Sequence, residues 1–427
     1  MRRAVLLASA RTFASLRRHR NYRLFFAGQL ASVCGTWMQN VAMYWLAVEL
    51  APGSRGLAVG LLSICRFVPF TLLGLLAGVV TDRLDNRRTV VVTQSVQMAL
   101  SALLAAVTLL GHVRLWELYA IAALTGTALV FDAPARQSLT FQMVGREELP
   151  NAVALNSSLF NTARIFGPAV AGIVIAGWGP GWAFAVNAAS FLAVLAGLLA
   201  MRPPELFPLA RRARPTIWRG TREGLAYARR TPRVRVVLAM MVVFASICFN
   251  FNILLPLLAK QTLAAGPRSF GVLSASFGAG ALVGALASAA VASTRWRVLL
   301  VGAGGFGVAE LLLAPTRSLP LAVALLFVCG VCFTTYTANS NAAVQLETPD
   351  HLRGRMLALY YYAWNGLAPF GALFVGWLCD AGGTPLAFAV AGMCALTMTT
   401  LGALAVVRPR PRTQPAAAAA VPERLAA

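Results

Sequence analysis

The chain has 427 residues, of which 58% are hydrophobic and only 12% are charged, and its formal net charge is +23 at pH 7. Soluble globular domains carry about 25% charged residues, so this composition excludes a soluble domain and indicates a chain surrounded by lipid. The basic residues lie mainly in connections between apolar runs, which favours a role in membrane orientation over nucleic-acid binding.

Long apolar runs, separated by turns and charges, predict twelve membrane-spanning helices. Each run is about as long as the ~20 residues that a helix needs to cross a bilayer. None of the connections between them is long enough for an enzyme domain. The runs cover residues 24–50, 57–80, 89–110, 116–138, 152–176, 182–201, 235–258, 269–292, 298–315, 319–345, 356–379 and 384–407.

Arginine is concentrated in the connections on one side of the predicted bundle. Ten basic residues fall in 202–235, and seven precede the first span. Because basic residues are retained on the cytoplasmic side, both termini are expected in the cytoplasm, and the chain in the bacterial inner membrane. The opposite connections hold only Arg55, Arg114, Lys260, Arg268 and Arg317.

The basic segment 202–234 divides the chain into two halves, 1–201 and 235–407. A stretch of this segment, 216–230, is partly amphipathic. It either lies along the inner membrane surface or is a plain linker. Residues 408–427, rich in alanine and proline, are expected to form a disordered cytoplasmic tail.

The two halves share local sequence patterns. Pro168 and Pro369 each lie in the fifth span of their half. An Ala-Phe pair, at 183–184 and again at 387–388, opens each sixth span. These correspondences predict a parallel repeat of two six-helix units.

The turn between the second and third spans carries an unusual density of charge. It reads Gly78-x-x-x-Asp82-Arg83-x-x-x-Arg87-Arg88. A glycine allows two helices to approach closely, and an acid at a helix end can accept hydrogen bonds from a neighbouring helix N-terminus and pair with an arginine. We expect this turn to act as a gate that holds one conformation and releases in another.

The turn resembles the signature of the major facilitator superfamily, and the resemblance implies that superfamily's all-helical fold. The superfamily often has a basic residue where Asn86 stands, so Arg87 or Arg88 is expected to supply the partner of Asp82. Glycines allow close packing in the fifth span, and a proline bends it where it crosses another span. This span resembles the motif typical of the superfamily's antiporters through Gly167, Pro168 and Gly172.

Further motifs resemble one branch of the superfamily, the transmembrane secretion effectors, which includes the enterobactin exporter and macrolide efflux proteins. The resemblance covers most of the chain and implies export driven by proton entry. Substrates vary widely within that branch, so the resemblance selects none. The motifs are Leu16-Arg-Arg-His-Arg-Asn21-Tyr22-Arg23, Gly35-Thr-Trp37-Met-Gln39, Phe131-Asp132-Ala-Pro134-Ala-Arg136-Gln137, Asn151-Ala-Val-Ala-Leu155-Asn156 and Arg353-Gly354-Arg355.

Charged residues inside spans are costly and therefore indicate functional positions. Asp132 and Arg136 lie one helical turn apart in the fourth span and share a face. Asp132 is expected to pair with Arg136, with Arg164 of the fifth span, or with the turn 82–88. Protonation of Asp132 would break such a pair and couple proton binding to conformation. The alternative is a permanent structural ion pair.

Three more ionisable residues lie in the predicted spans. Arg66 lies near the middle of the second span and either binds an anionic substrate or pairs with an acid on another span. Glu49 and Glu310 lie near the outer ends of their spans, and an interfacial position is expected for both.

Polar side chains at helical spacing indicate which faces line the transport pathway. In the superfamily, the first, second, fourth and fifth spans of each half enclose the cavity. Aromatic and amide groups together suit a large amphipathic substrate. The candidates for the cavity wall are Gln39, Asn40, Arg66, Asn161, Asn250, Asn341, Tyr361 and Asn365.

These features predict a secondary active transporter that exports a siderophore, drug or similar amphipathic metabolite by alternating access with proton antiport. An importer or a lysolipid flippase on the same fold is the alternative. The spans lack the clustered His, Cys or acidic residues of an enzyme, so no catalysis, metal or cofactor is expected. The expected partners are the substrate, protons and lipid but no nucleic acid, and a monomer is expected.

Overall fold

The computed structural model shows a helical protein. Tight turns and short loops connect the helices. The gating candidate Asp82 and the expected tail 408–427 lie outside the described residues. The structure describes residues 13–81, 83–208, 217–290 and 296–407.

The first group of helices is N-terminal, and its members pack against one another. Local signals set several helix starts. Asp85 caps α5, because its Oδ1 accepts a hydrogen bond from the Arg88 backbone N–H at 2.7 Å. Proline opens α7, where its missing N–H is not needed. The bounds are α2 Ala14–Arg18, α3 Arg20–Leu50, α4 Arg55–Thr81, α5 Asn86–Leu109, α6 Leu115–Trp178 and α7 Pro180–Leu199.

The second group is C-terminal and contains one irregular rod, in which α9, η2, α10 and η3 follow each other almost without a break. Two π-helical turns, η2 and η3, flank α10 there. The bounds are η1 Pro203–Glu205, α8 Ile217–Arg230, α9 Pro232–Val243, η2 Phe244–Cys248, α10 Phe251–Leu257, η3 Leu258–Thr262, α11 Pro267–Ala290, α12 Trp296–Leu313, α13 Leu319–Leu346, α14 Asp350–Gly366 and α15 Ala368–Val407.

Glycines interrupt the two longest helices. Helix α6 has 64 residues, which at 1.5 Å per residue would be roughly three times the thickness of a bilayer core. Gly145 in α6 has φ 69° and Gly383 in α15 has φ 72°. Because other residues rarely adopt positive φ, these two positions break the helical course. Among the described residues, nine helices are long and apolar enough to cross a membrane.

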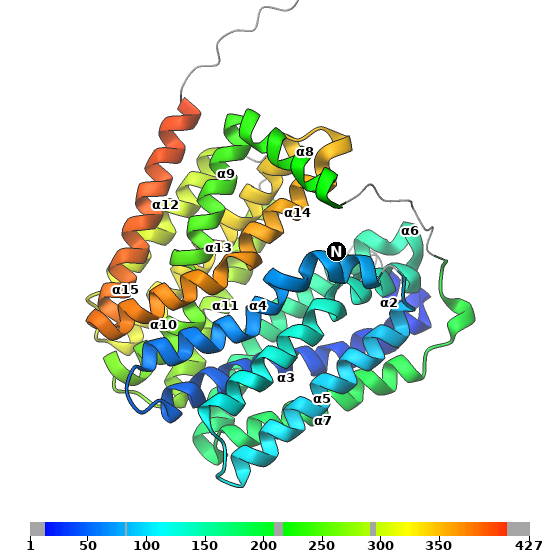
Figure 1. The fold of residues 1–427 in the computed structure, drawn as a ribbon, viewed down its shortest axis with the longest axis horizontal. Helices are drawn as coiled ribbons and strands as arrows, with labels where there is room; N and C mark the ends of the chain where they lie inside the picture. The colour runs from blue at the N-terminus through cyan, green and yellow to red at the C-terminus, as the bar shows by residue number, and fades with distance from the viewer. Residues whose placement is uncertain (1–12, 82, 209–216, 291–295, 408–427) are drawn as a thin grey trace, which may run out of the picture.

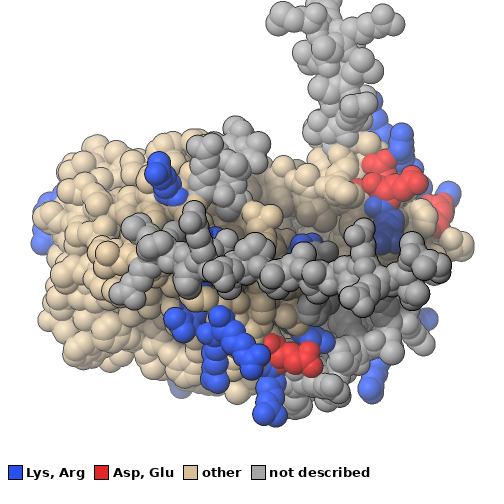
Figure 2. Space-filling view, turned by 90° about the horizontal axis from the view of Figure 1, so that it is seen from above, with Lys and Arg blue, Asp and Glu red and all other residues tan. Residues whose placement is uncertain are grey.

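The two groups of helices meet along two seams. Helix α6 packs against α11, and α4 packs against α15. Figure 1 shows the groups side by side at the lower left and further apart toward the upper right, where α8 lies. We call this side, with α2, α8 and Gly145, the α8 end, and the side where α3 ends and α4 begins the far end. Figure 2 views the α8 end and shows arginines with a few acids among them.

The amphipathic stretch expected in the linker forms α8, and one face of it packs against the C-terminal group. Glu223 of α8 forms an ion pair with Arg355 of α14. The Tyr227 hydroxyl donates to the backbone carbonyl of Glu347. These contacts fix the linker helix to the end of the second group, so it is more than a plain connection.

Candidate functional site

A cavity of about 890 Å³ lies among the helices of the N-terminal group. Its volume is in the range of sites that hold drug-sized molecules. Apolar side chains such as Val33, Leu129 and Phe160 form part of its wall. The polar side chains of the wall come from α3, α4, α5 and α6, and include Ser32, Thr36, Asn40, Arg66, Gln94, Gln97, Asp132, Arg136, Thr140, Ser157 and Asn161.

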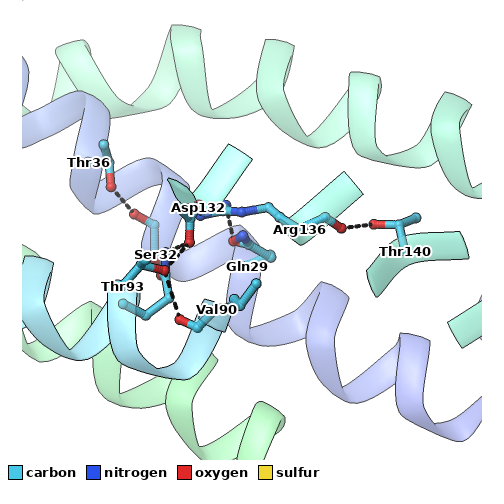
Figure 3. Close-up of polar contacts among 9 residues, drawn as sticks. Gln29, Ser32, Thr36, Val90, Thr93, Asp132, Arg136 and Thr140 are labelled. Atoms are coloured by element: carbon cyan, nitrogen blue, oxygen red, sulfur yellow. Dashed lines mark hydrogen bonds and ion pairs between the residues drawn. The ribbon is translucent and has the colours of Figure 1, made fainter. Parts of the chain in front are cut away.

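An ion pair between Asp132 and Arg136 lies on this wall. Asp132 is fully buried, and its Oδ2 pairs with the Arg136 guanidinium one turn along α6. Its Oδ1 accepts hydrogen bonds from Thr93 Oγ1 at 2.7 Å and from Gln94 Nε2 at 2.9 Å. Figure 3 shows Asp132 between Arg136 and the α5 residue Thr93. Two donors from α5 and one from α6 therefore hold the carboxylate.

Arg136 also connects α6 to α3. Its Nη1 donates to Gln29 Oε1 at 3.0 Å, as Figure 3 shows. The guanidinium thus bridges an acid on its own helix and an amide on the first helix. Any change that releases Arg136 from Asp132 would alter contacts among α3, α5 and α6 together.

Arg164 is not the partner of Asp132, which corrects one of the pairings expected from the sequence. Its guanidinium instead lies 5.6 Å from the ring centroid of Trp37, 5.5 Å from that of Phe277 and 5.9 Å from that of Phe333. Phe277 and Phe333 belong to the C-terminal group, so this cation lies at the junction of the groups. Cation–π contacts contribute about 0.5–2 kcal/mol each, more when they are desolvated.

The far end is closed by Asp380, a residue that the sequence reasoning missed. Its Oδ1 accepts from the Gly56 N–H at 2.7 Å and its Oδ2 from the Leu57 N–H at 2.8 Å. The carboxylate of α15 thus satisfies two free N–H groups at the positive N-terminal end of α4. No local signal could reveal this contact, because 324 positions separate Gly56 from Asp380.

A second far-end contact involves Lys260, the single lysine of the chain. Its Nζ lies 3.6 Å from Glu49 Oε1 and 5.0 Å from the ring centroid of Trp45. Trp45 in turn stacks on Phe270 of α11. Glu49 and Trp45 belong to α3, so both contacts join the two groups of helices.

The residues of the antiporter-type motif lie at helix crossings. A side chain at Gly167 would meet the Cβ of Trp37 at 2.5 Å. One at Gly172 would lie 3.1 Å from the Cα of Gly271 in α11, and the carbonyl of Pro168 also lies close to Gly271. The motif therefore allows α6 to approach α3 within its own group and α11 across the junction.

Among the described residues, the charged turn contacts other helices of the N-terminal group. Arg87 donates from Nε to the Leu198 carbonyl at 2.8 Å and from Nη2 to the Leu199 carbonyl at 3.2 Å, which caps the end of α7. Arg83 and Arg88 are exposed. Gly78 lies in the last turns of α4. Because Asp82 lies outside the described residues, its partner stays a prediction.

The structure distributes the cavity candidates over several places. Asn40, Arg66 and Asn161 lie on the wall of the large cavity. Asn250 and Asn365 line a smaller cavity of about 70 Å³ between the groups.

Three of the candidates lie elsewhere. The prediction that Gln39 lines the cavity is wrong. The residue is buried in the N-terminal group, and its Oε1 accepts hydrogen bonds from Ser101 and Asn187 at 2.6 Å. Asn341 accepts a hydrogen bond from Gln345, one turn along α13. Tyr361 is 53% exposed on α14.

The interfacial position predicted for Glu310 is also wrong, because its side chain is fully buried in the protein. Among the described residues, neither carboxyl oxygen has a hydrogen-bond partner. An ionised carboxylate without a donor in such a place would cost several kcal/mol. A position near the end of a span therefore did not reveal which face of α12 the side chain lies on.

The Glu310→Gln variant is expected to melt at the same or a higher temperature than the wild-type protein and to retain transport. Glutamine matches glutamate in shape but cannot ionise, so it avoids the cost of an unpaired buried charge. Thermal unfolding of the detergent-solubilised variant and uptake into vesicles would measure both effects. Loss of proton dependence in this variant would instead make Glu310 the proton-binding group.

Comparison with solved structures identifies the fold. The nucleoside transporter NupG superposes with a TM-score of 0.71 at 13% sequence identity, over 91% of this chain and all of that chain. A bacterial homologue of the lysosomal transporter Spinster, in an inward-facing and unoccupied conformation, gives a TM-score of 0.66 at 12% identity, over 91% of this chain and 96% of that chain. At these identities the likeness shows the fold alone, which is that of membrane transporters.

Sequence relatives are efflux-type transporters rather than enzymes. Macrolide efflux protein A of Streptococcus pyogenes is 21% identical over 385 residues, which cover 88% of this chain and 95% of that protein. The staphyloferrin A transporter of Staphylococcus aureus is 22% identical over 386 residues, which cover 88% of this chain and 94% of that protein. The family profile for transmembrane secretion effectors matches residues 10–426. The resemblance predicted from the sequence is thereby confirmed, and the chain belongs to the transmembrane secretion effector family of major facilitator transporters.

Proposed function

We propose that this protein exports a small amphipathic molecule, such as a drug, siderophore or metabolite, in exchange for protons. The observation that carries the proposal is the buried Asp132–Arg136 pair on the wall of a drug-sized cavity. An ion pair in a membrane-embedded cavity is costly and marks sites of binding or coupling. Relatives named for macrolide efflux and staphyloferrin A transport support this class of substrate.

The proposed architecture has twelve spans in two six-helix halves, 1–201 and 235–407, joined by the linker 202–234. Within the described part of the chain, nine apolar helices, the more polar α3, and one interruption each in α6 and α15 support that number. The arginines at the α8 end indicate that this end faces the cytoplasm. The protein is proposed to act as a monomer in the bacterial inner membrane.

The far-end contacts of Asp380 and Lys260 support an inward-facing state, because they close the side opposite the cytoplasmic α8 end. Alternating access requires these contacts to break as the halves move. In the outward-facing state the turn 78–88 is proposed to close the cytoplasmic end instead, with Asp82 as the acceptor of hydrogen bonds from a neighbouring helix N-terminus. The residues Gly167, Pro168 and Gly172 are proposed to form the crossing about which α6 and α11 move.

Proton coupling is proposed to act through the pairing of Asp132. In the inward-facing state the carboxylate holds Arg136, Thr93 and Gln94. A proton that enters from outside would bind Asp132 in the outward-facing state and neutralise the carboxylate, and it would leave in the inward-facing state, where the carboxylate pairs with Arg136 again. A group that titrates differently in two states can bias their populations only by that difference.

Inverted membrane vesicles that contain the protein are expected to accumulate an exported fluorescent substrate when their lumen is acidified. The imposed gradient supplies the protons that exchange for substrate, so a protonophore should abolish the uptake. Vesicles without the protein, acidified in the same way, are the control for passive partition. Uptake that is unchanged after the gradient has collapsed would rule out proton antiport.

A further inference from the structure

The geometry points to a carboxylate-binding subsite at Arg66, on the inner part of the cavity wall, and so to an anionic amphiphile as the substrate. This inference rests on the proposed export function and names its substrate class. Arg66 belongs to α4 and lines the large cavity. Among the described residues, no acid pairs with its guanidinium and no acceptor is hydrogen-bonded to it, and Tyr44 is a polar neighbour. An unpaired charge in a membrane-embedded site is costly, so a partner that arrives with the substrate is the simplest role for it.

Several polar atoms near the same level also have no partner. Within the described residues, Asn40 Oδ1, Gln94 Oε1 and Gln97 Nε2 are buried without a hydrogen bond. Gln94 is 1% exposed and Gln97 is 6% exposed, and both residues line the cavity. Buried polar groups normally find a partner, so an unsatisfied set on a cavity wall indicates a ligand that completes it.

Most of these residues lie at a similar depth along their helices. Asn40, Arg66 and Gln97 each lie about 15–18 Å from the far-end terminus of their helix, at 1.5 Å per residue. Asp132 lies about 10 Å further toward the α8 end by the same rise. Arg66 therefore lies at the level of the cavity wall that is furthest from the α8 end, and the Asp132–Arg136 pair lies between Arg66 and the α8 end.

The backbone holds Arg66 firmly at this level. A Cβ added at Gly126 of α6 would lie 2.1 Å from the Arg66 carbonyl oxygen, so α4 and α6 cross here with almost no space between them. Tyr44 of α3 hydrogen-bonds Ser63, one turn before Arg66, at 2.9 Å. Close packing of the backbone fixes the point from which the Arg66 side chain extends, and this favours preorganised binding.

Charge and donor chemistry select the ligand group. Asp132 is the one acid on the described wall of this cavity, and Arg136 already neutralises it. The charge of Arg66 is thus uncompensated there. A guanidinium fork matches a carboxylate in a bidentate manner, and the Gln97 amide can donate to the same group. The apolar wall then suits the rest of an amphiphile.

Gln94 connects this subsite to the proposed coupling pair. Its Nε2 donates to Asp132 Oδ1 at 2.9 Å, whereas its Oε1 has no partner among the described residues. A hydroxyl or amide beside the carboxylate of the substrate could donate to that oxygen. The Gln94 side chain would then contact both the substrate bound at Arg66 and the Asp132 carboxyl group that binds the proton.

The test measures binding of a matched probe series to the purified full-length protein in nanodiscs. The probes are a dansyl-labelled medium-chain fatty acid, its primary amide, its amine analogue and its phosphate monoester. The acid is expected to bind about tenfold more tightly than the amide, because only the acid offers an anion to the guanidinium. The amine is expected to bind more weakly than either.

Variants locate the selectivity. In Arg66→Gln the acid and the amide are expected to bind equally, whereas Arg66→Lys should retain part of the preference. Arg317→Gln removes the same charge from an exposed far-end position and should leave the preference unchanged. The wild-type probe series needs no variant, so a misfolded Arg66→Gln protein does not remove the test.

Equal binding of acid and amide by the wild-type protein would overturn the inference, as would a preference that survives Arg66→Gln. Tighter binding of the phosphate ester than of the acid would assign the site to a phosphate headgroup and overturn the carboxylate assignment. Binding is measured without a gradient, so a failure of proton-driven export leaves this result intact. If the acid and the amide inhibited export equally well, the proposed export function would stand, but the carboxylate-binding subsite would be refuted.

Discussion

Replacement of Asp132 by asparagine is expected to lower proton-driven transport about a hundredfold while the protein still inserts and folds. Asparagine preserves the shape of the side chain and can still accept from Thr93 and Gln94. It cannot bind a proton, and it loses the charge that holds Arg136. A hydrogen bond to a charged group contributes about 1.5–3 kcal/mol, and about 2.8 kcal/mol corresponds to a hundredfold change in an equilibrium.

The measurement is the pH dependence of uptake into inverted vesicles, with the amount of folded protein determined by monodisperse gel filtration. Glu147→Gln is the matched control, because Glu147 is an exposed acid at the α8 end and lies outside the cavity wall and the turn 78–88. This variant also removes one acidic charge, so it should transport normally. Wild-type pH dependence in Asp132→Asn would exclude Asp132 as the proton-coupling group.

A paired variant separates a switch from a permanent structural ion pair. Removal of Asp132 alone leaves Arg136 as a partly buried cation that has lost its partner, which is destabilising in itself. The combined Asp132→Asn and Arg136→Gln variant removes both charges. A coupling role predicts that this variant regains thermal stability but not proton dependence. Recovery of both would indicate that the pair only supports the structure.

The Asp132–Arg136 contact could be predicted because it is local. Residues four apart on a helix share a face, so the sequence alone places both groups together. The same reasoning left Arg164 as an equal alternative, since helical periodicity says nothing about which neighbouring helix a side chain meets. Its aromatic partners Phe277 and Phe333 lie on the other group of helices. Contacts across the junction thus depend on how two separate groups dock.

Gln39 and Asn40 show that polar residues at helical spacing do not by themselves identify the side chains that line the cavity. They are adjacent in sequence, so they point about 100° apart on α3. Asn40 faces the cavity, whereas Gln39 bonds with Ser101 and Asn187 inside the group. In a membrane protein polar side chains serve both as lining and as links between helices. Polarity alone therefore could not decide which of the two faces the substrate.

The closed far end leads to a second large effect, which is expected for Gly56→Val. A Cβ at Gly56 would lie 2.1 Å from the Gly376 carbonyl oxygen, and a Cβ at Gly376 would lie 2.4 Å from the Gly56 carbonyl oxygen. Both obstacles are backbone atoms that cannot rotate away. The larger side chain would also separate the Gly56 N–H from the carboxylate of Asp380. The far end is thus expected to stay open.

Such a variant should shift the equilibrium at least about a hundredfold away from the inward-facing state, because about 2.8 kcal/mol corresponds to that factor and backbone overlap costs more. Spin labels at Arg114 and Arg317, both exposed at the far end, would report the opening as a longer distance in a background without native cysteines. Gly53→Val is the matched control, since no atom lies within 4 Å of the added Cβ. If both variants gave the wild-type distance and transport rate, closure at Gly56 would not be part of the cycle. A longer distance and blocked transport in Gly56→Val alone would tie transport to the contact between α4 and α15.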